Sequence, residues 1–339
     1  MIRSIIQVEQ VRRTYLTEQG MWRKKKQTVE ALKGISFEVG QGEIFGLLGP
    51  NGAGKTTMIK ILTTMLIPTD GHVNILGLNP VTEFRALRPQ INFILGGERN
   101  LYWRLSAYDN LTYFADLYKV PKGQQKDKIQ ALLELVGLEA SAHRRVETFS
   151  KGMKQRLQIA RGLINEPQIL FLDEPSIGLD PISARKLRQI IHQLNEQGTT
   201  ILLTTHYMQE ADELCDRIAF INQGEIAAID TPEQLKKKIG QLSVIQFSHA
   251  HTSGISAASS ALGIHPAVHH LEETHDEYST TLRIHTPDPQ QIIPLIYKEW
   301  SQSDVHNLSI NEPSLEDVYL RLIGGDRDAS RMAGTVANR

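Results

Sequence analysis

The nine residues GPNGAGKTT, at positions 49–57, constrain the fold of this chain more than any other stretch. They match the phosphate-binding pattern G-x-x-x-x-G-K-[ST] in full. The apolar run EIFGLL before them and the helical pattern KTTMIKILTTML after them supply the strand–loop–helix context that the pattern requires. Glycines let backbone N–H groups turn toward phosphate oxygens, and the following helix directs the positive end of its dipole at the same charge. The stretch predicts a nucleoside triphosphate site.

Two side chains of this stretch can add to the main-chain amides. Lys55 is expected to reach the β- and γ-phosphates, and the Thr56 hydroxyl is expected to coordinate Mg²⁺. The residues expected to contact the nucleotide here are Gly49, Pro50, Asn51, Gly52, Ala53, Gly54, Lys55, Thr56 and Thr57.

A second apolar run, ILFLDEPS, ends in the acidic pair Asp173 and Glu174. Its four apolar residues indicate a buried strand, and the carboxyl end of such a strand is where open α/β sheets bind ligands. We expect Asp173 to bind Mg²⁺ and Glu174 to orient or deprotonate the attacking water; the alternative is an acidic pair exposed to solvent. The sequence contains no Asn-Lys-x-Asp tetrad for guanine, so a GTPase is not expected.

A histidine ends a further apolar strand, ILLTTH, at His206. Alone, such a histidine is more often structural, with its ring hydrogen-bonded inside the fold. Because this strand is expected at the same sheet edge as the triphosphate site, a contact of His206 with the γ-phosphate is the favoured interpretation.

Apolar strands alternate with helical patterns along most of the chain, which predicts an α/β fold with a parallel sheet covered on both faces. The stretch RIAFINQGEIAAID predicts a hairpin that turns at residues 222–224. Beyond residue 230, strands are expected at LSVIQFSH, STTLRIHT and VHNLSINEP, and helices at SGISAASSAL and DPQQIIPLIYKEW. We expect a first domain over residues 1–230 with a helical subdomain at about 98–166, a small α+β domain over 231–324 and a disordered tail over 325–339.

Composition restricts the class of protein. The net charge of the 339 residues is −1, so the chain lacks the basic field of a typical nucleic-acid-binding protein, and no nucleic-acid partner is expected. No apolar run reaches the roughly 18 residues of a membrane span, and the N-terminus lacks a signal-peptide pattern. The single cysteine, Cys215, excludes an internal disulfide and a cysteine-based metal cluster. A soluble intracellular protein is expected.

The N-terminal strand pattern SIIQVEQVRRTY is interrupted by LTEQGMWRKKKQTVE before it resumes as ALKGISFEVGQGE. The insert holds the basic run Arg23, Lys24, Lys25 and Lys26. A solvated loop is the favoured interpretation, and a contact with lipid headgroups or a membrane partner is the alternative.

The order of GPNGAGKTT, FSKGMKQRL, ILFLDEPS, IGLD and TTH resembles that of ATP-binding cassette (ABC) ATPases over residues 1 to about 230. The closing SLEDVYLRLIGG resembles the C-terminal segment of cassette subunits from bacterial exporters of drugs, lipids or polysaccharides. The resemblance implies a P-loop NTPase of the ABC type, with a mixed sheet, antiparallel N-terminal strands and a helical subdomain. It also implies ATP and Mg²⁺, a permease as a separate chain, a second copy in a homodimer, and a location on the inner face of the cell membrane through the permease.

The resemblance assigns roles to further residues. Tyr15 would stack on adenine. Ser150 and Gly152 match the Ser and the second Gly of the family signature Leu-Ser-Gly-Gly-Gln, and Asp180 in IGLD matches the loop that communicates between the two sites of a dimer. Ser150, Gly152 and Asp180 would act in trans, on the nucleotide of the second copy.

This sequence departs from the family pattern at two places. Within the signature, Phe149, Lys151 and Met153 differ, although exporter cassettes commonly show this Lys-Gly-Met form. The family's metal-binding and permease-coupling glutamine aligns at about Gly97, where ILGGERN has no glutamine. Gln90 lies seven residues earlier, at the expected start of a strand. Either the adjacent Glu98 substitutes for the glutamine or the metal shell is looser.

Other classes of function are open at this point. ABC proteins of translation normally carry two cassettes, and this chain has one P-loop; the DNA-repair type contains long coiled coils, and this chain has no sustained heptads. A regulator without a transport partner is the third class. Eight of the twelve histidines lie in the expected second domain; we expect them to be solvated, and a pH sensor or a metal site is the alternative.

Overall fold

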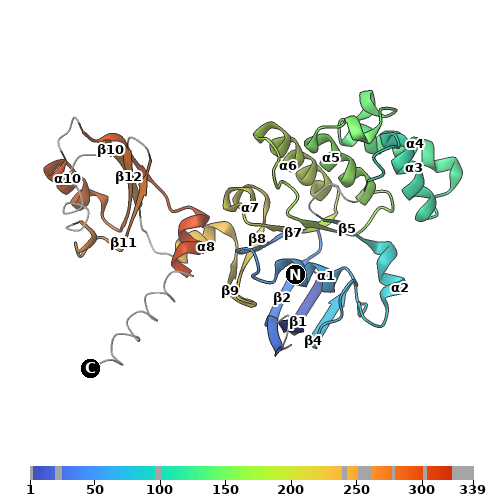
Figure 1. The fold of residues 1–339 in the computed structure, drawn as a ribbon, viewed down its shortest axis with the longest axis horizontal. Coiled ribbons are helices and arrows are strands. Elements are labelled where there is room, and N and C mark those ends of the chain that lie inside the picture. Colours follow the sequence, from blue (N-terminus) through green and yellow to red (C-terminus); the bar gives the residue numbers. More distant parts are fainter. Residues whose placement is uncertain are drawn as a thin grey trace. The chain divides into compact units, whose positions relative to one another are not determined.

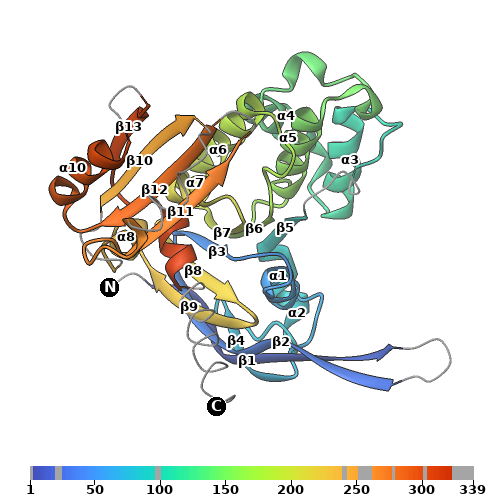
Figure 2. The same cartoon turned by 60° about the vertical axis from the view of Figure 1, so that its left-hand side comes forward.

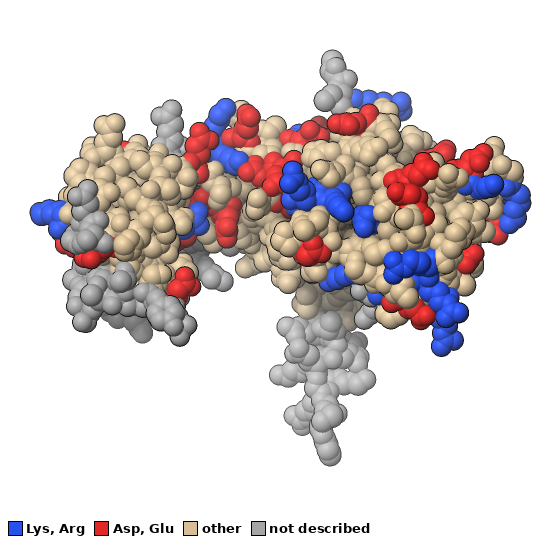
Figure 3. All heavy atoms as spheres, turned by 90° about the horizontal axis from the view of Figure 1, so that it is seen from above, with Lys and Arg blue, Asp and Glu red and all other residues tan. Residues whose placement is uncertain are grey.

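The computed structural model describes residues 3–19, 25–95, 101–238, 243–250, 262–276, 279–300 and 304–322. The chain divides into two compact units, Met1–Pro232 and Glu233–Arg339 (Figure 1). In the described part of the chain, no helix combines the length and the apolar character that a membrane crossing needs. Basic and acidic side chains lie side by side over the face shown in Figure 3, in keeping with a net charge of −1.

A six-stranded sheet forms the centre of the first unit, in the order β5-β6-β7-β3-β8-β9. Neighbours pair in parallel except β8 and β9, which form the hairpin predicted at residues 222–224. Strands β3, β6 and β7 are buried along their whole length, and this burial explains their unbroken apolar sequences. The strands are β3 (Ile44–Leu48), β5 (Ile91–Leu95), β6 (Ile169–Asp173), β7 (Thr200–Thr205), β8 (Arg217–Asn222) and β9 (Glu225–Asp230).

A three-stranded antiparallel sheet of order β2-β1-β4 completes the strands of this unit. Its strands are β1 (Ser4–Gln19), β2 (Lys25–Gly40) and β4 (Asp70–Ile75). A loop was expected over the insert, residues 16–30, and this expectation is wrong for both ends of the insert. Leu16 pairs with Thr28, and the ladder continues to Gln19 and Lys25. The two strands form the long ribbon seen in Figure 2, in which each satisfies the backbone groups of the other. Residues 20–24 and the side chains of the basic run lie outside the described residues.

Helix α1 (Lys55–Leu62) packs between the two sheets. Its Met58 and Ile59 share a core with Ile35 of β2 and with Phe45 and Leu47 of β3. Figure 1 shows the larger helices on the side of the six-stranded sheet away from β1, β2 and β4. These are α5 (Lys151–Gly162), α6 (Pro181–Glu196) and α7 (Met208–Leu214). The sheet is therefore covered on both faces, as the strand sequences predict.

The helical segment between β5 and β6 contains α3 (Ala107–Leu117), α4 (Lys122–Leu135) and α5, which pack against one another. Helix α3 begins at an N-cap, where the Ser106 hydroxyl accepts from the Asp109 amide. Shorter helical pieces are α2 (Phe84–Leu87) and the 3₁₀ turns Arg88–Gln90, Glu139–Ser141 and Val146–Thr148.

The second unit contains a four-stranded antiparallel sheet of order β11-β12-β10-β13. Its strands are β10 (Ser243–Ala250), β11 (His270–His275), β12 (Ser279–Thr286) and β13 (His306–Asn311). Helix α10 (Pro289–Glu299) contributes Ile292 and Ile296 to a core with Phe247, Ile284 and Trp300. Helix α8 (Pro232–Lys238) begins at the division between the units, and residues 315–322 are also helical.

Two histidines of this unit contradict the expectation of a solvated set. His249 of β10 and His285 of β12 are buried, and the His285 Nε2 atom lies 3.6 Å from Oδ1 of the buried Asp317. The described residues contain no cluster of His, Cys, Asp and Glu that could hold a metal ion. Strand β11, with the polar sequence HLEETH, was not expected. Most of the expected helix SGISAASSAL and the tail over 325–339 lie outside the described residues.

Candidate active site

The phosphate loop, residues 49–54, connects the carboxyl end of β3 to α1. Gly52 and Gly54 have φ angles of 83° and 115°, in the left-handed region that favours glycine. Gly49 is constrained by space, because a Cβ at this position would lie 2.1 Å from the backbone oxygen of Ile221. The amide of Gly224, in the β8–β9 turn, donates to the Ala53 carbonyl at 3.0 Å. The loop is therefore held by β8 and its hairpin.

Lys55 is the first residue of α1, and its side chain is 5% exposed. Its Nζ donates to the carbonyl oxygens of Gly49, at 2.6 Å, and Pro50, at 3.2 Å. The same Nζ lies 3.6 Å from Oε1 of Glu174. The ammonium group thus lies inside the phosphate loop and beside the carboxylate that follows the end of β6.

Thr56 and Asp173 meet across the gap between α1 and β6. The Thr56 hydroxyl donates to Oδ2 of Asp173 at 3.2 Å, and the Thr204 hydroxyl donates to Oδ1 at 2.6 Å. A hydroxyl and a carboxylate are oxygen ligands of the type that Mg²⁺ prefers, and Mg²⁺ usually keeps waters and substrate phosphate oxygens as further ligands. The donor set therefore fits Mg²⁺ bound together with a nucleotide.

Glu174 and His206 follow the ends of neighbouring parallel strands, β6 and β7. The Nδ1 atom of His206 lies 3.3 Å from Oε2 of Glu174. Glu174 has a φ angle of 48°, and its amide is held by the carbonyl oxygen of Thr204 at 3.0 Å and by the Thr204 hydroxyl at 3.1 Å. Strand β7 thereby fixes the turn that presents the Glu174 carboxylate to Lys55 and His206.

Ser150, Gly152 and Asp180 lie at the N-termini of α5 and α6. The Ser150 hydroxyl caps α5 by accepting from the Met153 amide at 3.2 Å. A Cβ on Gly152 would lie 2.4 Å from the Ser183 hydroxyl oxygen. Ser183 also donates its amide (2.9 Å) and its hydroxyl (2.6 Å) to Asp180, and these bonds lower the pKa of Asp180. Ser183 thus connects Gly152 with Asp180, and among the described residues no hydrogen bond or ion pair joins these groups to the phosphate loop.

Tyr15 lies on β1, opposite Val29 of β2, and the guanidinium carbon of Arg13 is 4.7 Å from its ring centroid. The same strand β2 passes beside the phosphate loop, because a Cβ on Gly54 would lie 2.8 Å from the Ala31 carbonyl oxygen. Tyr15 is therefore on the strand pair adjacent to the loop.

The expected glutamine position is only partly described. Gly97 and Glu98 lie outside the described residues. Gln90 precedes β5, as expected, and its side chain accepts from Gln168 Nε2 at 2.9 Å, at the sheet edge opposite to the phosphate loop. Gln90 is therefore far from the position that a metal ligand of this site would need.

Three residues that orient the site are not predicted by the sequence patterns: Thr204, Ser176 and Glu210. Thr204 bridges β6 and β7 through Asp173 and the Glu174 amide, and Glu210 accepts from the hydroxyls of Ser176 and Thr205. One sequence feature could have indicated them, the two adjacent threonines directly before His206. Hydroxyl groups at the end of an apolar strand need hydrogen-bond partners, so polar side chains are expected nearby.

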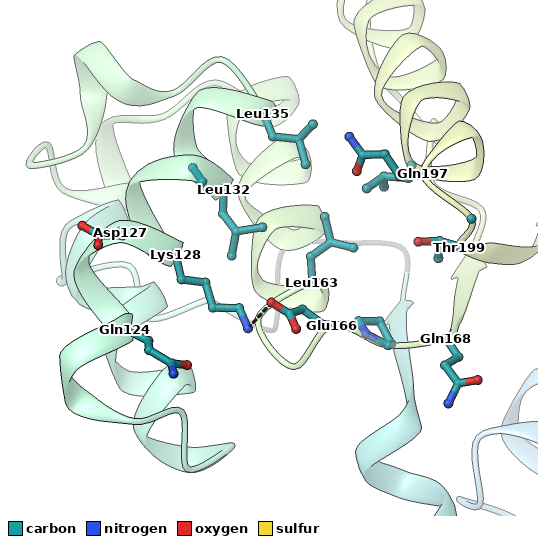
Figure 4. Close-up of a pocket in the computed structure, with 14 residues that line it drawn as sticks. Gln124, Asp127, Lys128, Leu132, Leu135, Leu163, Glu166, Gln168, Gln197 and Thr199 are labelled. Atoms are coloured by element: carbon teal, nitrogen blue, oxygen red, sulfur yellow. Dashed lines mark ion pairs between the residues drawn. The ribbon is translucent and has the colours of Figure 1, made fainter.

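A separate cavity of about 690 Å³ lies between α4, the segment 163–168 and the end of α6. Figure 4 shows Lys128 and Glu166 pointing toward one another across it, with their charged atoms 2.8 Å apart. Gln168 and Thr199, in its lining, precede the amino ends of β6 and β7. The cavity is therefore at the edge of the sheet opposite to the phosphate loop, where open α/β sheets do not bind their nucleotides.

Comparisons with known proteins agree with this geometry. A family model described as ABC transporter matches residues 32–177. The chain is 34% identical to the linearmycin resistance ATP-binding protein LnrL of Bacillus subtilis, over 94% of this chain and 98% of that protein. It is 47% identical to a fluoroquinolones export ATP-binding protein of Mycobacterium tuberculosis, over 63% of this chain and 70% of that protein. A solved dimeric ATP-binding cassette bound to ADP and Pi superposes with a TM-score of 0.59 and 27% identity, over 67% of this chain and 98% of that one.

Proposed function

Because the chain belongs to the ATP-binding proteins of ABC transporters, we propose that it is the ATP-hydrolysing subunit of a membrane exporter. The observation that carries this proposal is the meeting of Lys55, Asp173, Glu174 and His206 at the carboxyl ends of β3, β6 and β7. ATP is the substrate, and its phosphates bind to the amides of residues 49–57 and to Lys55. Tyr15 stacks on the adenine, and its place on β1, which pairs with the strand β2 beside the phosphate loop, supports this role.

Thr56 and Asp173 would hold Mg²⁺, which when bound would compensate charge on the phosphate oxygens. Thr204 orients the Asp173 carboxylate for this role through the 2.6 Å hydrogen bond to Oδ1. The Asp173 carboxylate thus has one oxygen fixed by β7 and the other directed at Thr56.

In hydrolysis, Glu174 accepts a proton from the attacking water as the water oxygen bonds to the γ-phosphorus and the bond to the bridging oxygen of ADP breaks. His206 donates to the γ-phosphate, and its Nδ1 atom lies 3.3 Å from the Glu174 carboxylate. Lys55 stabilises negative charge that develops on the phosphate oxygens. The chain's own groups thus supply position and charge, which are what phosphoryl transfer to water needs.

Two copies form the complete catalytic assembly. Ser150, Gly152 and Asp180 act on the nucleotide of the second copy, so the signature helix α5 of one copy closes the site of the other. Two observations support this arrangement. Among the described residues, no hydrogen bond or ion pair joins these three residues to the phosphate loop of the same chain, and a similar cassette bound to ADP and Pi is dimeric.

A permease, as a separate chain, docks on the helical segment and keeps the ATPase on the inner face of the cell membrane. Tyr102, Trp103, Tyr113 and Leu117 form an exposed apolar surface there, and Leu117 is 61% exposed. Such patches mark interaction surfaces. Arg161 of α5 connects α3 with the central sheet, since it donates to the Phe93 carbonyl of β5 at 3.2 Å and packs its guanidinium 5.2 Å from the Phe114 ring of α3.

Two measurements test the proposal. The purified chain is expected to release phosphate from ATP only with Mg²⁺, and the Asp173→Ala variant is expected to be inactive.

In source cells the chain is expected to sediment with membranes. The double variant Tyr113→Asp, Leu117→Asp is expected to become soluble with unchanged phosphate release, whereas the control Ile67→Asp, also at an exposed apolar residue, is not. A wild-type chain without ATPase activity would contradict the proposed hydrolysis. A double variant that stays with membranes would contradict docking through this surface.

A further inference from the structure

Glu210, on α7, is a carboxylate buried away from solvent behind the active site, with 3% of its surface exposed. Its Oε2 atom accepts two hydrogen bonds, from the Ser176 hydroxyl at 2.9 Å and from the Thr205 hydroxyl at 2.7 Å. Its Oε1 atom is also buried and has no hydrogen-bond partner among the described residues. A single carboxylate oxygen therefore joins two hydroxyls that are 29 positions apart in the sequence.

Each hydroxyl lies within two residues of a side chain that takes part in the proposed reaction, Ser176 in the turn after β6 and Thr205 at the end of β7. Ser176 lies two residues after Glu174 and four before Asp180, and its carbonyl accepts from the Leu179 amide at 3.0 Å. Thr205 directly precedes His206, and its hydroxyl also accepts from the Tyr207 amide at 3.0 Å. Glu210 thus ties the turn after Glu174 to the turn that presents His206.

This arrangement is costly for a residue that serves stability alone. Burial of a carboxylate costs free energy unless hydrogen bonds and charges compensate it, and a well-packed apolar side chain is often as stable or more so. Burial raises the pKa of Glu210, and the nearby charges of Arg188 and His206 act in the opposite direction and lower it. What the carboxylate gains is two charge-assisted hydrogen bonds, which are roughly twice as strong as neutral ones.

We propose that Glu210 is a positioning residue for ATP hydrolysis, which holds Glu174 and His206 in their mutual geometry through Ser176 and Thr205. The inference rests on the proposed function and adds a residue to it. Glu210 itself contacts neither of the two reacting side chains by hydrogen bond, so it acts through the hydroxyls. Loss of its carboxylate lets the turn after β6 and the end of β7 move independently, which lowers the rate of the chemical step and leaves the phosphate loop intact.

The test compares five variants of the full chain in steady-state phosphate release and in ATP binding. Glu210→Ala removes both hydrogen bonds and is expected to lower kcat at least about tenfold, which corresponds to ~1.4 kcal/mol in the barrier, with the Kd for ATP within about twofold of wild type. Glu210→Gln can accept both hydroxyls with its one amide oxygen and is expected to restore most of kcat. Glu213→Ala, on the same helix and paired with Arg188 near the surface, is the matched control and is expected to match wild type.

Ser176→Ala and the double variant Ser176→Ala, Glu210→Ala show whether Glu210 acts through Ser176. Because both changes break the same interaction, the double variant is expected to lose little more kcat than Glu210→Ala alone. Multiplicative losses, or a folded Glu210→Ala variant with kcat within twofold of wild type, would overturn the inference. If Glu210→Ala does not fold, the kcat of Ser176→Ala, a variant that lacks only one oxygen atom, decides whether the inference holds. An inactive wild-type chain would instead overturn the proposed function.

Discussion

The ammonium nitrogen of Lys55 lies 3.6 Å from a carboxylate oxygen of Glu174, and both side chains are largely shielded from solvent. One residue opens the helix after β3, and the other follows the end of β6, two strands away in the sheet. Each of the two charges is stabilised by the other, because loss of either side chain leaves the remaining charge without its nearby opposite charge. Substitutions at the two positions therefore have to be interpreted together.

Lys55→Ala is expected to weaken ATP binding at least about 100-fold, because the variant lacks the ammonium that the phosphate loop directs at the phosphates. Isothermal titration with ATP measures this change. Lys60→Ala, at an exposed position of the same helix, is the control and is expected to bind as wild type does. An unchanged Kd for Lys55→Ala would remove Lys55 from the phosphate site.

Glu174→Gln is expected to lower phosphate release at least about 100-fold, because the amide accepts no proton from water. ATP still binds, so the variant is expected to accumulate as a dimer in gel filtration with saturating ATP. Glu196→Gln, at an exposed position of α6, should show neither change. A Glu174→Gln variant that elutes only as a monomer under these conditions would count against hydrolysis as the step that separates the copies.

Gly49→Ala is expected to destabilise the fold by about 2 kcal/mol or more, because its Cβ would overlap the backbone oxygen of Ile221 and backbone cannot move aside as a side chain can. Chemical denaturation measures the loss. Gly123→Ala, in α4 with open space around the new Cβ, is the matched substitution and should be neutral or slightly stabilising. Equal stability of the two variants would show that the contact at Gly49 does not constrain the loop.

The second unit is expected to lose stability as the pH falls. Burial lowers the pKa of His285 below its ordinary 6.5, and Asp317 and Glu272 oppose this effect while His270 and Arg283 add to it. The unfolded chain therefore binds the proton more tightly, so the free energy of unfolding is highest above pH 6.5 and decreases as the pH falls from there toward the pKa of the folded state.

Amide hydrogen exchange of β12, corrected for the intrinsic exchange rate, measures this dependence between pH 7.5 and 5.5. His285→Asn removes the titrating group and is expected to flatten the profile, whereas His306→Gln, at an exposed position, should keep it. A profile that is the same with and without His285 would assign the pH dependence to another group.

Much of the site follows from sequence because parallel strands end at one edge. The apolar runs before residue 49, before Asp173 and before His206 predict three such strands, and in the structure β3, β7 and β6 are consecutive in the sheet. Sequence pattern could not predict the contacts that orient these residues. The bonds of Thr204 to Asp173 and of Glu210 to Ser176 join side chains about 30 positions apart, and no local periodicity encodes them.

Errors in the fold have the same origin. The flanks of the N-terminal insert are polar and were interpreted as a loop, yet they continue the β1–β2 ladder, since a two-stranded ribbon needs cross-strand partners and no buried face. His249 and His285 look like surface residues in sequence, and only the register of β10 and β12 turns them inward.

The order of the central sheet also sets when the phosphate loop can form during synthesis. Strand β3 pairs with β7 and β8, with Ile44 opposite Ile201 and Phe45 opposite Arg217. Such distant pairings close slowly, and a chain emerges from the ribosome with its N-terminal part first. The phosphate loop is thus among the first segments to be translated and among the last to gain its neighbouring strands. A chain that stalls before residue 222 carries the whole nucleotide-binding motif and lacks the β8 strand that holds it.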